Sequence, residues 1–400
     1  MEPVRLLVVG AGQRGSTYTR RAAASGAATI VGVAEADPVR RERFASAYGI
    51  ERENVFSDWS SVDTRIADAA VIATPDRDHE GPAVRLAGLG YHLLLEKPMA
   101  PSFEPASRIA EAAVSADVML AVCHVMRYTA YTQALKSLVD SGRIGRIVSI
   151  QHLEPVGWWH HAHSFVRGNW RSAADSSPML LAKSCHDIDW LLYLAGQPAR
   201  RVSSFGGLAH FTPSSKPAGA GDRCVSCAVE STCPYSAVRL YSPASSGWPR
   251  DVLGDDLEVA LREGPYGECV YNGQNDVVDH QVVNMELADG ATVSFTMTAF
   301  TPFEQRKTRI FGTHGYLSGN GARVRLVDFR TGADEVVEVG DSVVAGHDDG
   351  DEGVVDAFLA AVASGDRTLI RSDAATSLAG HRVVWAAEEA RALGTVVELP

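Results

Sequence analysis

The sequence predicts an α/β protein with two domains: a doubly wound parallel sheet, followed by an α+β domain with a mainly antiparallel sheet. As far as residue 122, continuous apolar runs alternate with helix-like stretches of about 10 to 15 residues, which is typical of βαβ units. Beyond residue 125, groups of strands lie beside segregated helices. The length of 400 residues is too great for one compact core and fits two domains.

Residues 1–125 form the first predicted domain. Its apolar runs are bounded by turn residues and are separated by segments with helical periodicity. The predicted strands are residues 4–10, 29–35, 69–74, 91–97 and 118–125, and the predicted helices are residues 14–25, 38–48, 79–88 and 103–116.

Residues 126–400 form the second predicted domain. Asp289-Gly290 separates two β-rich runs and predicts a hairpin. The composition of residues 212–267 turns rich in Pro, Gly and Ser, so we expect a long insertion or lid there. The predicted strands are residues 146–156, 276–300, 307–319, 322–329 and 335–339, and the predicted helices are residues 131–141, 179–194, 354–363 and 373–393.

Composition and charge exclude several classes of protein. The net charge of −12, from 37 basic and 49 acidic residues, disfavours a nucleic-acid or anionic-membrane partner. No apolar run approaches the ~20 residues that span a bilayer, and the N-terminus lacks the basic region and cleavage site of a secretory signal. Six cysteines are too few for a disulfide scaffold. We therefore expect a cytoplasmic protein.

A glycine-rich turn follows the first predicted strand. Gly10, Gly12 and Gly15 have the G-x-G-x-x-G spacing of a Rossmann dinucleotide-binding domain, at the start of a βαβ unit. The first glycine allows a tight turn, the second admits a pyrophosphate, and the third allows close packing of helix and strand. With Gln13 and Arg14, these glycines are the candidate phosphate cradle, since free amides at a helix N-terminus bind anions.

The second predicted strand ends at Glu35, 20 residues after Gly15. A carboxylate at this distance binds the ribose 2′-hydroxyl and repels a 2′-phosphate, which favours NAD over NADP. Arg40 and Arg41 keep NADP open as the alternative.

Further motifs carry a resemblance to a known family. After the motifs "VIATPDRDH" and "LLLEKP", the sequence continues with "HVMRYT" and "GNWR". In this order they resemble the glucose-fructose oxidoreductase / inositol dehydrogenase family (Gfo/Idh/MocA), and the likeness covers nearly the whole chain. The matching residues are Thr74, Pro75, His79, Glu96, Lys97, Pro98, Arg127, Tyr128, Trp170 and Arg171.

The resemblance implies an NAD(P)-dependent dehydrogenase acting on a sugar, inositol or related polyol. It implies that Lys97 reaches both the substrate and the nicotinamide ribose, at the carboxyl end of a parallel strand where ligands bind. We also expect a homodimer or homotetramer formed through the C-terminal sheet. The remaining cofactor-binding candidates are Thr74, Pro75, His79, Glu96, Arg127, Trp170 and Arg171.

The stretch "AKSCHDID", residues 182–189, holds the second group of catalytic candidates. Typical family members carry an aspartate four residues before a histidine here, and His186 fits that histidine. Ala182 occupies the aspartate position, which puts the standard dehydrogenase assignment in doubt, and Lys183 lies on the same predicted helical face as His186. We expect Lys97, Lys183 and His186 to be catalytic, with neutral imidazole as the base. The alternatives are a metal box, disfavoured by its spacing, and a buried structural segment.

The cysteines Cys224, Cys227 and Cys233 have the spacing C-x2-C-x5-C, whose first half is typical of zinc sites. Cys269 is the expected fourth ligand, and Cys185 and His210 are alternatives. Zinc would then be structural. An iron–sulfur centre and free buried thiols are the other interpretations.

An aromatic stretch, "GWWHHAHSFVRGNWR", suits sugar rings, which present apolar CH faces and many hydroxyls. Metal binding by its histidines is disfavoured because no helical spacing aligns all three, and ordinary packing of the tryptophans is an equal alternative. The substrate-binding candidates are Tyr128, Trp158, His160 and Asp187.

Two other functions compete with a sugar or polyol dehydrogenase. Some relatives use NAD to oxidise a glycoside transiently, eliminate the aglycone and return the hydride. A non-catalytic nucleotide-binding sensor is the third hypothesis, against which the joint presence of Lys97, Lys183 and His186 argues.

Overall fold

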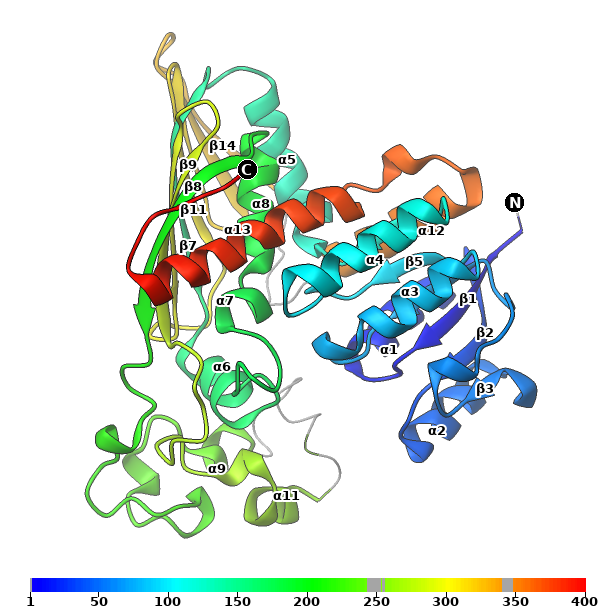
Figure 1. Ribbon diagram of the computed structural model, residues 1–400. Helices are drawn as coiled ribbons and strands as arrows, with labels where there is room; N and C mark the ends of the chain where they lie inside the picture. Colours follow the sequence, from blue (N-terminus) through cyan, green and yellow to red (C-terminus); the bar gives the residue numbers. More distant parts are fainter. Residues whose placement is uncertain (1, 243–252, 254–255, 340–347) are drawn as a thin grey trace.

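The computed structural model describes residues 2–242, 253, 256–339 and 348–400. Figure 1 shows a parallel-sheet domain, drawn mainly in blue and cyan, beside a large sheet that carries a lobe of turns and short helices at one end. This arrangement confirms the predicted combination of a parallel N-terminal sheet and a mainly antiparallel C-terminal sheet. In the described residues, no helix is long and apolar enough to cross a membrane.

The N-terminal sheet has six strands in the order β3-β2-β1-β4-β5-β6, and every pair is parallel. The strand order reverses between β1 and β4, and ligands bind at the carboxyl ends of the strands near such a reversal. The two-residue strand β3 was not predicted because it is too short for a periodic signal. The strands are β1 (Val4–Val9), β2 (Ala28–Ala34), β3 (Val55–Phe56), β4 (Ala69–Ile72), β5 (His92–Leu95) and β6 (Leu120–Val122).

Helices cover both faces of this sheet: α1 (Gln13–Ala24), α2 (Pro38–Tyr48), α3 (Glu80–Gly88), α4 (Phe103–Ser115) and α12 (Asp348–Ser364). The last of these comes from the far end of the chain. Val354 and Phe358 of α12 are buried in the same apolar cluster as Val8 of β1 and Tyr18 of α1. A segment beyond residues 1–125 therefore completes the first domain.

The second sheet has nine strands in the order β14-β13-β12-β11-β7-β10-β9-β8-β15. The central pair β7–β10 is parallel, and the other pairs are antiparallel. The predicted hairpin is present, and Gly290 in its turn has a φ of +86°. The strands are β7 (Ile147–Pro155), β8 (Ala199–Gly207), β9 (His280–Leu287), β10 (Thr292–Thr298), β11 (Lys307–Gly312), β12 (Gly315–Gly319), β13 (Arg323–Asp328), β14 (Asp334–Glu338) and β15 (Val397–Glu398).

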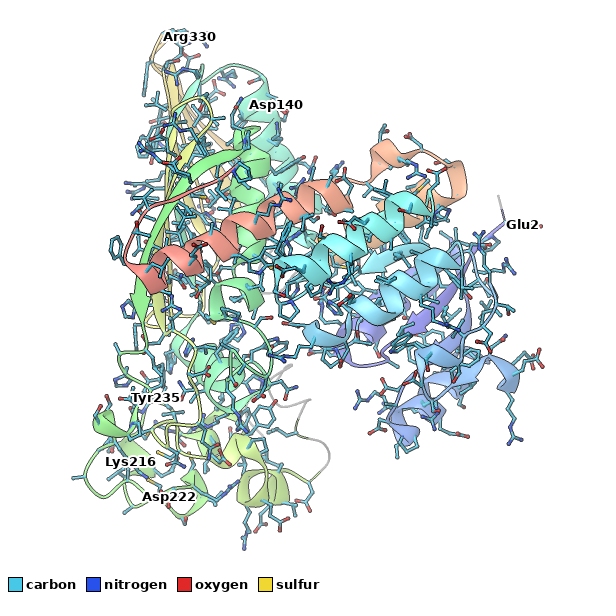
Figure 2. The ribbon with its side chains drawn as sticks, in the orientation of Figure 1. Glu2, Asp140, Lys216, Asp222, Tyr235 and Arg330 are labelled. Carbon is cyan, nitrogen blue, oxygen red and sulfur yellow. The ribbon has the colours of Figure 1, made fainter. Side chains whose placement is uncertain are left out.

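Helices α5 (Ala130–Asp140), α8 (Cys185–Ala195) and α13 (Ala374–Leu393) lie between this sheet and the first domain. Helix α13 links the two bodies, since Trp385 donates from Nε1 to the carbonyl of Pro101 (3.1 Å) and packs edge-on against Phe103 of α4. The lobe at the end of the sheet holds the predicted insertion, with α9 (Ala237–Leu240) and α11 (Leu257–Glu263). Figure 2 labels Lys216, Asp222 and Tyr235 in this lobe, far from the parallel sheet.

The single helix predicted over residues 179–194 is two helices, α7 (Met179–Ala182) and α8. The N–H groups of Lys183 and Ser184 still donate to the carbonyls of Met179 (2.9 Å) and Leu180 (3.0 Å), and the next helix starts with Asp187 and Ile188 donating to Ser184. The apolar pattern did not signal the interruption, because Leu181, Cys185 and Ile188 are buried on both sides of it.

A buried ion pair joins the end of the first domain to α8. Arg127, in the 3-10 turn Val125–Tyr128 that follows β6, donates from Nε and Nη2 to the two carboxylate oxygens of Asp189, both at 2.7 Å. Both side chains are almost fully buried, so each depends on the other to offset its loss of hydration.

Replacing Arg127 with Met should lower the free energy of unfolding by about 3–5 kcal/mol, because it leaves the Asp189 carboxylate buried without its partner. Urea titration of the full chain measures the change. The control R325A breaks an exposed ion pair with Asp334 and should change the midpoint little. An equal loss of stability in R127M and R325A would contradict the expectation that the buried ion pair matters more than the exposed one.

Candidate active site

The glycine turn has the conformation that its spacing predicts. Gly10 has a φ of +89°, and a Cβ there would lie 2.6 Å from the carbonyl oxygen of Ala73. A Cβ on Gly15 would lie 2.0 Å from the carbonyl oxygen of Gly10, so helix and strand pack too closely for any side chain. Helix α1 has no side-chain cap. Its first amides are therefore available to a phosphate group, and these residues fit a dinucleotide.

Glu35 lies at the carboxyl end of β2 and is almost buried. Its carboxylate accepts hydrogen bonds from the backbone N–H of Ala11 (2.8 Å) and of Asp37 (3.0 Å). It thus fixes the glycine turn as well as standing at the predicted ribose position. Arg40 lies 3.7 Å from this carboxylate, and Arg41 donates to the carbonyl of Glu35 (2.6 Å).

Arg14 and Glu96 belong to a brace among α1, β5 and α12. Arg14 donates to both carboxylate oxygens of Asp351, at 2.9 and 2.6 Å, and lies 3.5 Å from Glu96. The hydroxyl of Tyr18 donates to Glu96 (2.5 Å). These contacts give Arg14 and Glu96 a structural role next to the predicted cradle, while Gln13 is exposed at the start of α1.

His79 connects the loops that follow β4 and β5. Its ring nitrogens lie 2.9 Å from the carbonyl oxygen of Thr74 and 2.8 Å from that of Pro98, and its side chain is fully buried. Pro98 follows Lys97 through a cis peptide bond. His79 therefore sets the path of the backbone on both sides of Pro75 and beside Lys97.

Lys97 reaches from the first domain to the second. It follows β5, and its Nζ donates to the carbonyl oxygen of Ala182, the last residue of α7 (2.6 Å). The carbonyl lies where the helix is interrupted before α8. Ala182 occupies the position that an aspartate takes in the family pattern described above. In this chain its backbone oxygen accepts the hydrogen bond of Lys97.

Lys183 belongs to a buried network of alternating charges. Its Nζ lies 3.3 Å from Glu154 of β7, whose other oxygen lies 2.8 Å from Arg306. Arg306 also pairs with Asp187 (2.5 Å), which contacts His152 (3.0 Å). Burial lowers the pKa of Lys183, and the nearby Glu154 carboxylate opposes that fall.

Asp187 faces this network and is fully buried. Burial alone would raise its pKa, but Arg306 and His152 outweigh burial and hold it well below its usual range. These partners occupy the carboxylate, so its position favours a supporting role over the expected substrate contact.

His186 lies in the first turn of α8 and is buried. Its ring packs edge-on against that of His124 at 5.7 Å, and His124 packs against His381 at 5.4 Å. His124 directly follows Cys123 at the carboxyl end of β6. Burial, then the charges of Arg127 and Lys97, lower the pKa of His124 well below its usual value, so its ring is neutral.

His124 and Glu154 are site residues that the sequence analysis did not identify. Neither ring nitrogen of His124 has a hydrogen-bond partner among the described residues. Its place at the end of a parallel strand was the available signal. Glu154 gave none, because in a strand it resembles any polar residue.

Two residues of the family motifs, Arg127 and Tyr128, make their described contacts with other parts of the protein. Arg127 is committed to Asp189, as described above. The hydroxyl of Tyr128 lies 3.1 Å from that of Ser372 and accepts from the backbone N–H of Arg371 (2.8 Å). Tyr128 is buried against α12, in the apolar cluster of the first domain. Its surroundings thus favour packing over the expected substrate contact.

The aromatic stretch begins with α6 (Trp158–His161) and borders both the site and the lobe. Trp158 is partly exposed and donates from Nε1 to the carbonyl of Pro234 (3.3 Å). Burial, then the charge of Lys183, lowers the pKa of His160 well below its usual value. His160 is therefore close enough to the catalytic candidate Lys183 to be influenced by its charge.

Trp170 and Arg171 lie further along the same stretch. Trp170 is partly exposed and packs against Phe165, and Arg171 lies 3.8 Å from Glu268 in the lobe. Their described contacts are with the second domain and its lobe rather than with the glycine turn. Their assignment to the cofactor stays a prediction.

His161 is fully buried between aromatic rings. It stacks on Phe165 at 5.6 Å and on Phe211 at 5.0 Å, and neither ring nitrogen has a hydrogen-bond partner among the described residues. Burial lowers its pKa to about 4. His163 instead contacts the hydroxyl of Tyr241 (2.6 Å), whereas His160 and His161 both pack against Phe165.

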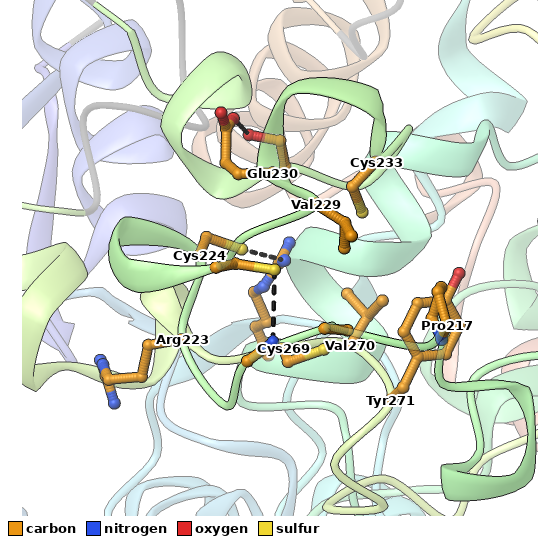
Figure 3. A pocket seen from close by; sticks show the side chains of 14 residues that line it. Pro217, Arg223, Cys224, Val229, Glu230, Cys233, Cys269, Val270 and Tyr271 are labelled. Atoms are coloured by element: carbon orange, nitrogen blue, oxygen red, sulfur yellow. Dashed lines mark hydrogen bonds between the residues drawn. The ribbon is translucent and has the colours of Figure 1, made fainter.

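The four expected metal-ligand cysteines meet in the lobe. Cys224, Cys227, Cys233 and Cys269 line one pocket (Figure 3). The alternative ligand Cys185 lies in the core of the second domain. As they stand, no three His, Cys, Asp or Glu side chains in the described part of the chain are grouped closely enough to hold a metal ion.

The glycine turn follows the first strand of a parallel sheet, and Lys97 extends from the carboxyl end of that sheet to a second domain. These features are typical of a dinucleotide-binding α/β fold. A model described as "Oxidoreductase family, NAD-binding Rossmann fold" matches residues 4–124, and one described as "GFO/IDH/MocA C-terminal domain" matches residues 132–318. The chain belongs to this GFO/IDH/MocA oxidoreductase family.

Three curated relatives are similar in sequence. YteT of Bacillus subtilis (strain 168) is 26% identical over 73% of this chain and 70% of its own length. The 2,7-anhydro-N-acetylneuraminate hydratase of Escherichia coli (strain K12) is 29% identical over 44% of this chain and 46% of its own. An inositol 2-dehydrogenase of Streptomyces avermitilis is 32% identical over 49% and 54%. The chain thus matches about half the length of the last two.

A solved structure of similar fold spans the whole chain. It is an oxidoreductase from Agrobacterium radiobacter in complex with NAD+, L-tartaric acid and magnesium. The TM-score is 0.74 at 16% identity, and the match covers 100% of this chain and 98% of that one. At this identity the likeness establishes the fold.

Replacing His161 with Phe should reduce the loss of stability in acid. The unfolded chain binds a proton at His161 below about pH 6.5, whereas the folded chain resists protonation down to about pH 4. Stability should therefore fall by up to about 1.4 kcal/mol per pH unit between these values as the pH decreases.

Thermal unfolding at about pH 7, above this titration window, and at about pH 5, inside it, measures the difference. The matched variant H161Q also lacks the titrating group, so it should share the smaller pH dependence of H161F. Because it loses the aromatic packing, it should be less stable than H161F at both pH values. An unchanged pH dependence in both variants would contradict the assignment.

Proposed function

We propose that this protein is an NAD-dependent dehydrogenase that oxidises a secondary hydroxyl of a sugar, polyol or glycoside. The observation that carries the proposal is the contact of Lys97 with the Ala182 carbonyl (2.6 Å), which brings the carboxyl end of β5 against the start of α8 and His186. Family membership and the inositol 2-dehydrogenase relative support the same reaction class.

In this proposal each residue has a distinct role. Lys97 donates a hydrogen bond to the substrate hydroxyl oxygen and positions it, and His186 accepts the hydroxyl proton. NAD, when bound, supplies the acceptor for the hydride. Lys183 contributes positive charge that favours neutral His186 before reaction and an alkoxide-like oxygen during it.

The network behind Lys183 suits this role. Glu154, itself paired with Arg306, holds the ammonium group in place. An electrostatic contribution is largest when the charged groups need no reorganisation during the reaction. Lys183 thus replaces the absent carboxylate of position 182 as a polar partner, though with the opposite charge.

A second candidate is an NAD-dependent enzyme that cleaves a glycoside by transient oxidation, elimination and re-reduction. Ala182 favours it, because the chain lacks the aspartate of the standard dehydrogenase pattern. A hydratase among the relatives supports chemistry other than net oxidation on this scaffold.

The test is a screen of sugars, polyols and glycosides with NAD and the purified full chain, following NADH absorbance and released aglycone together. Accumulating NADH with an oxidised product supports the dehydrogenase. Aglycone release without NADH supports the second candidate. NAD binding without either product from any substrate class would contradict both.

We expect strongly non-additive effects at the catalytic residues. K97A and H186A should each remove most of kcat, and the double variant little more, since groups that act as a unit fail together. K183A should lower kcat and raise the pKa seen in the pH–rate profile, because a nearby positive charge disfavours the imidazolium.

Titration of NAD provides the check on folding, since binding should survive all three changes. The control K307A removes an exposed lysine that pairs with Glu304, and it should leave the rate and pH profile intact. Near-normal turnover in H186A would show that His186 is not catalytic and that residues 182–189 have a structural role.

Replacing Glu35 with Ala should weaken NAD binding more than NADP binding. The change removes a carboxylate at the ribose position and frees the two amides that it now accepts from. Titrations with each cofactor measure the ratio of Kd values. Tighter binding of NADP than of NAD by the unchanged protein would contradict the assignment.

A further inference from the structure

The lobe brings together four cysteines that lie apart in the sequence. Cys224 lies in the 3-10 turn Cys224–Ser226, Cys227 and Cys233 flank the turn Glu230–Thr232, and Cys269 follows α11. Cys269 is held beside the others because its N–H donates to the carbonyl of Asp222 (2.9 Å). All four line the pocket of Figure 3, while Cys123 and Cys185 are buried elsewhere.

Two of the four sulfurs accept a hydrogen bond from a backbone N–H. Gly221 donates to Cys227 (3.3 Å), and Ala237 donates to Cys224 (3.4 Å). Such N–H groups stabilise thiolate more than thiol.

A buried cation points to negative charge at the same place. Arg167 is 2% exposed and donates to the carbonyls of Glu268 and Tyr235, both at 2.8 Å, and to the sulfur of Cys224 (3.5 Å). Its Nη1 has no hydrogen-bond partner, and no carboxylate pairs with it, among the described residues. A buried guanidinium without a counter-charge is costly.

Four neutral thiols leave that charge uncompensated, whereas four thiolates around a divalent cation carry a net charge of −2. The charge of nearby Lys216 is already paired with Asp222 (2.7 Å), so Arg167 is the cation that thiolates would balance. The charges around the pocket therefore suit a thiolate-bound dication better than free thiols.

The size of the cavity decides between a single ion and a larger group. Its volume is about 20 Å³, whereas a single water molecule needs at least about 10–15 Å³. There is room for one ion and not for a cluster of several irons. Tetrahedral coordination by four thiolates is the usual closed site of zinc.

We propose that Cys224, Cys227, Cys233 and Cys269 bind one Zn²⁺ as a structural centre, with Arg167 as its buried counter-charge. Four S–H protons leave to solvent, four Zn–S bonds form, and nothing is oxidised or reduced. Because the thiols are not yet grouped at coordinating distance, they turn about their Cα–Cβ bonds to reach the ion, so that metal binding and final packing occur together.

The centre would stabilise a region with little apolar core of its own. The lobe's two apolar clusters are small, one around Phe211 and Tyr271 and the other around Tyr241 and Leu261. Pro234, next to Cys233, accepts the hydrogen bond of Trp158. The ion would thus also fix one end of the aromatic stretch beside the active site.

The first experiment is elemental analysis of the full chain purified without chelators, together with the variants C227A and C269A. About one zinc per chain should be present and should be lost in both variants. The matched controls C123A and C185A remove buried cysteines outside the pocket and should keep the metal. Zinc retained in C227A and C269A would overturn the proposal, as would a metal-free protein that binds no added Zn²⁺ after reduction.

Measurements on the unchanged protein keep the proposal testable if those variants fail to fold. Titration with a mercurial should release the zinc as four thiols react, and a chelator should expose four additional thiols. Release of zinc without reaction of these thiols would contradict the assignment. Iron with inorganic sulfide in place of zinc would overturn zinc as the occupant.

The role of Arg167 has its own test. R167M should weaken Zn²⁺ binding by about 10- to 100-fold in a chelator competition, as is usual for groups that support metal ligands. The control R171M removes a partly exposed arginine of the same stretch that contacts Glu268 rather than sulfur. Equal affinity in R167M and the unchanged protein would show that Arg167 is not the counter-charge.

Discussion

The hydrogen bond from Lys97 to the carbonyl of Ala182 is the contact on which the candidate site depends. It joins the carboxyl end of a parallel strand to the end of α7, at the point where the helix is interrupted. Without the interruption, that carbonyl would belong to a continuous helix and would be shared with an intrahelical N–H. The break therefore frees the acceptor for Lys97 and lets α8 begin at Cys185, one residue before His186.

Near this contact several charged side chains are held in largely buried ion pairs. Arg127 faces Asp189, and Lys183 and Arg306 face Glu154 and Asp187. Buried pairs of this kind contribute little net stability, but they penalise any arrangement that separates them. They therefore suit a site between two domains, where small displacements would spoil the geometry of hydride transfer.

The sequence predicted the fold well because strand and helix periods are local properties. The glycine spacing predicted the conformation of Gly10 and the packing of Gly15, and the apolar runs predicted the parallel sheet. The break at Lys183 was missed because the apolar pattern continues through it. Glu154 was missed because its role depends on Lys183 and Arg306, which are remote from it in sequence. Asp187 and Tyr128 were expected at the substrate, and their burial among other partners follows from packing that no local pattern records.

The return of α12 to the first domain has a consequence for how the chain folds. Val354 and Phe358 cover apolar surface of a sheet whose strands all precede residue 123. During synthesis, that surface stays uncovered until nearly the whole chain has been made. Domains usually fold in order from the N-terminus as they emerge, but the apolar cluster of this first domain is complete only when α12 has been made. A nascent chain that stops before α12 should therefore expose apolar surface on this sheet.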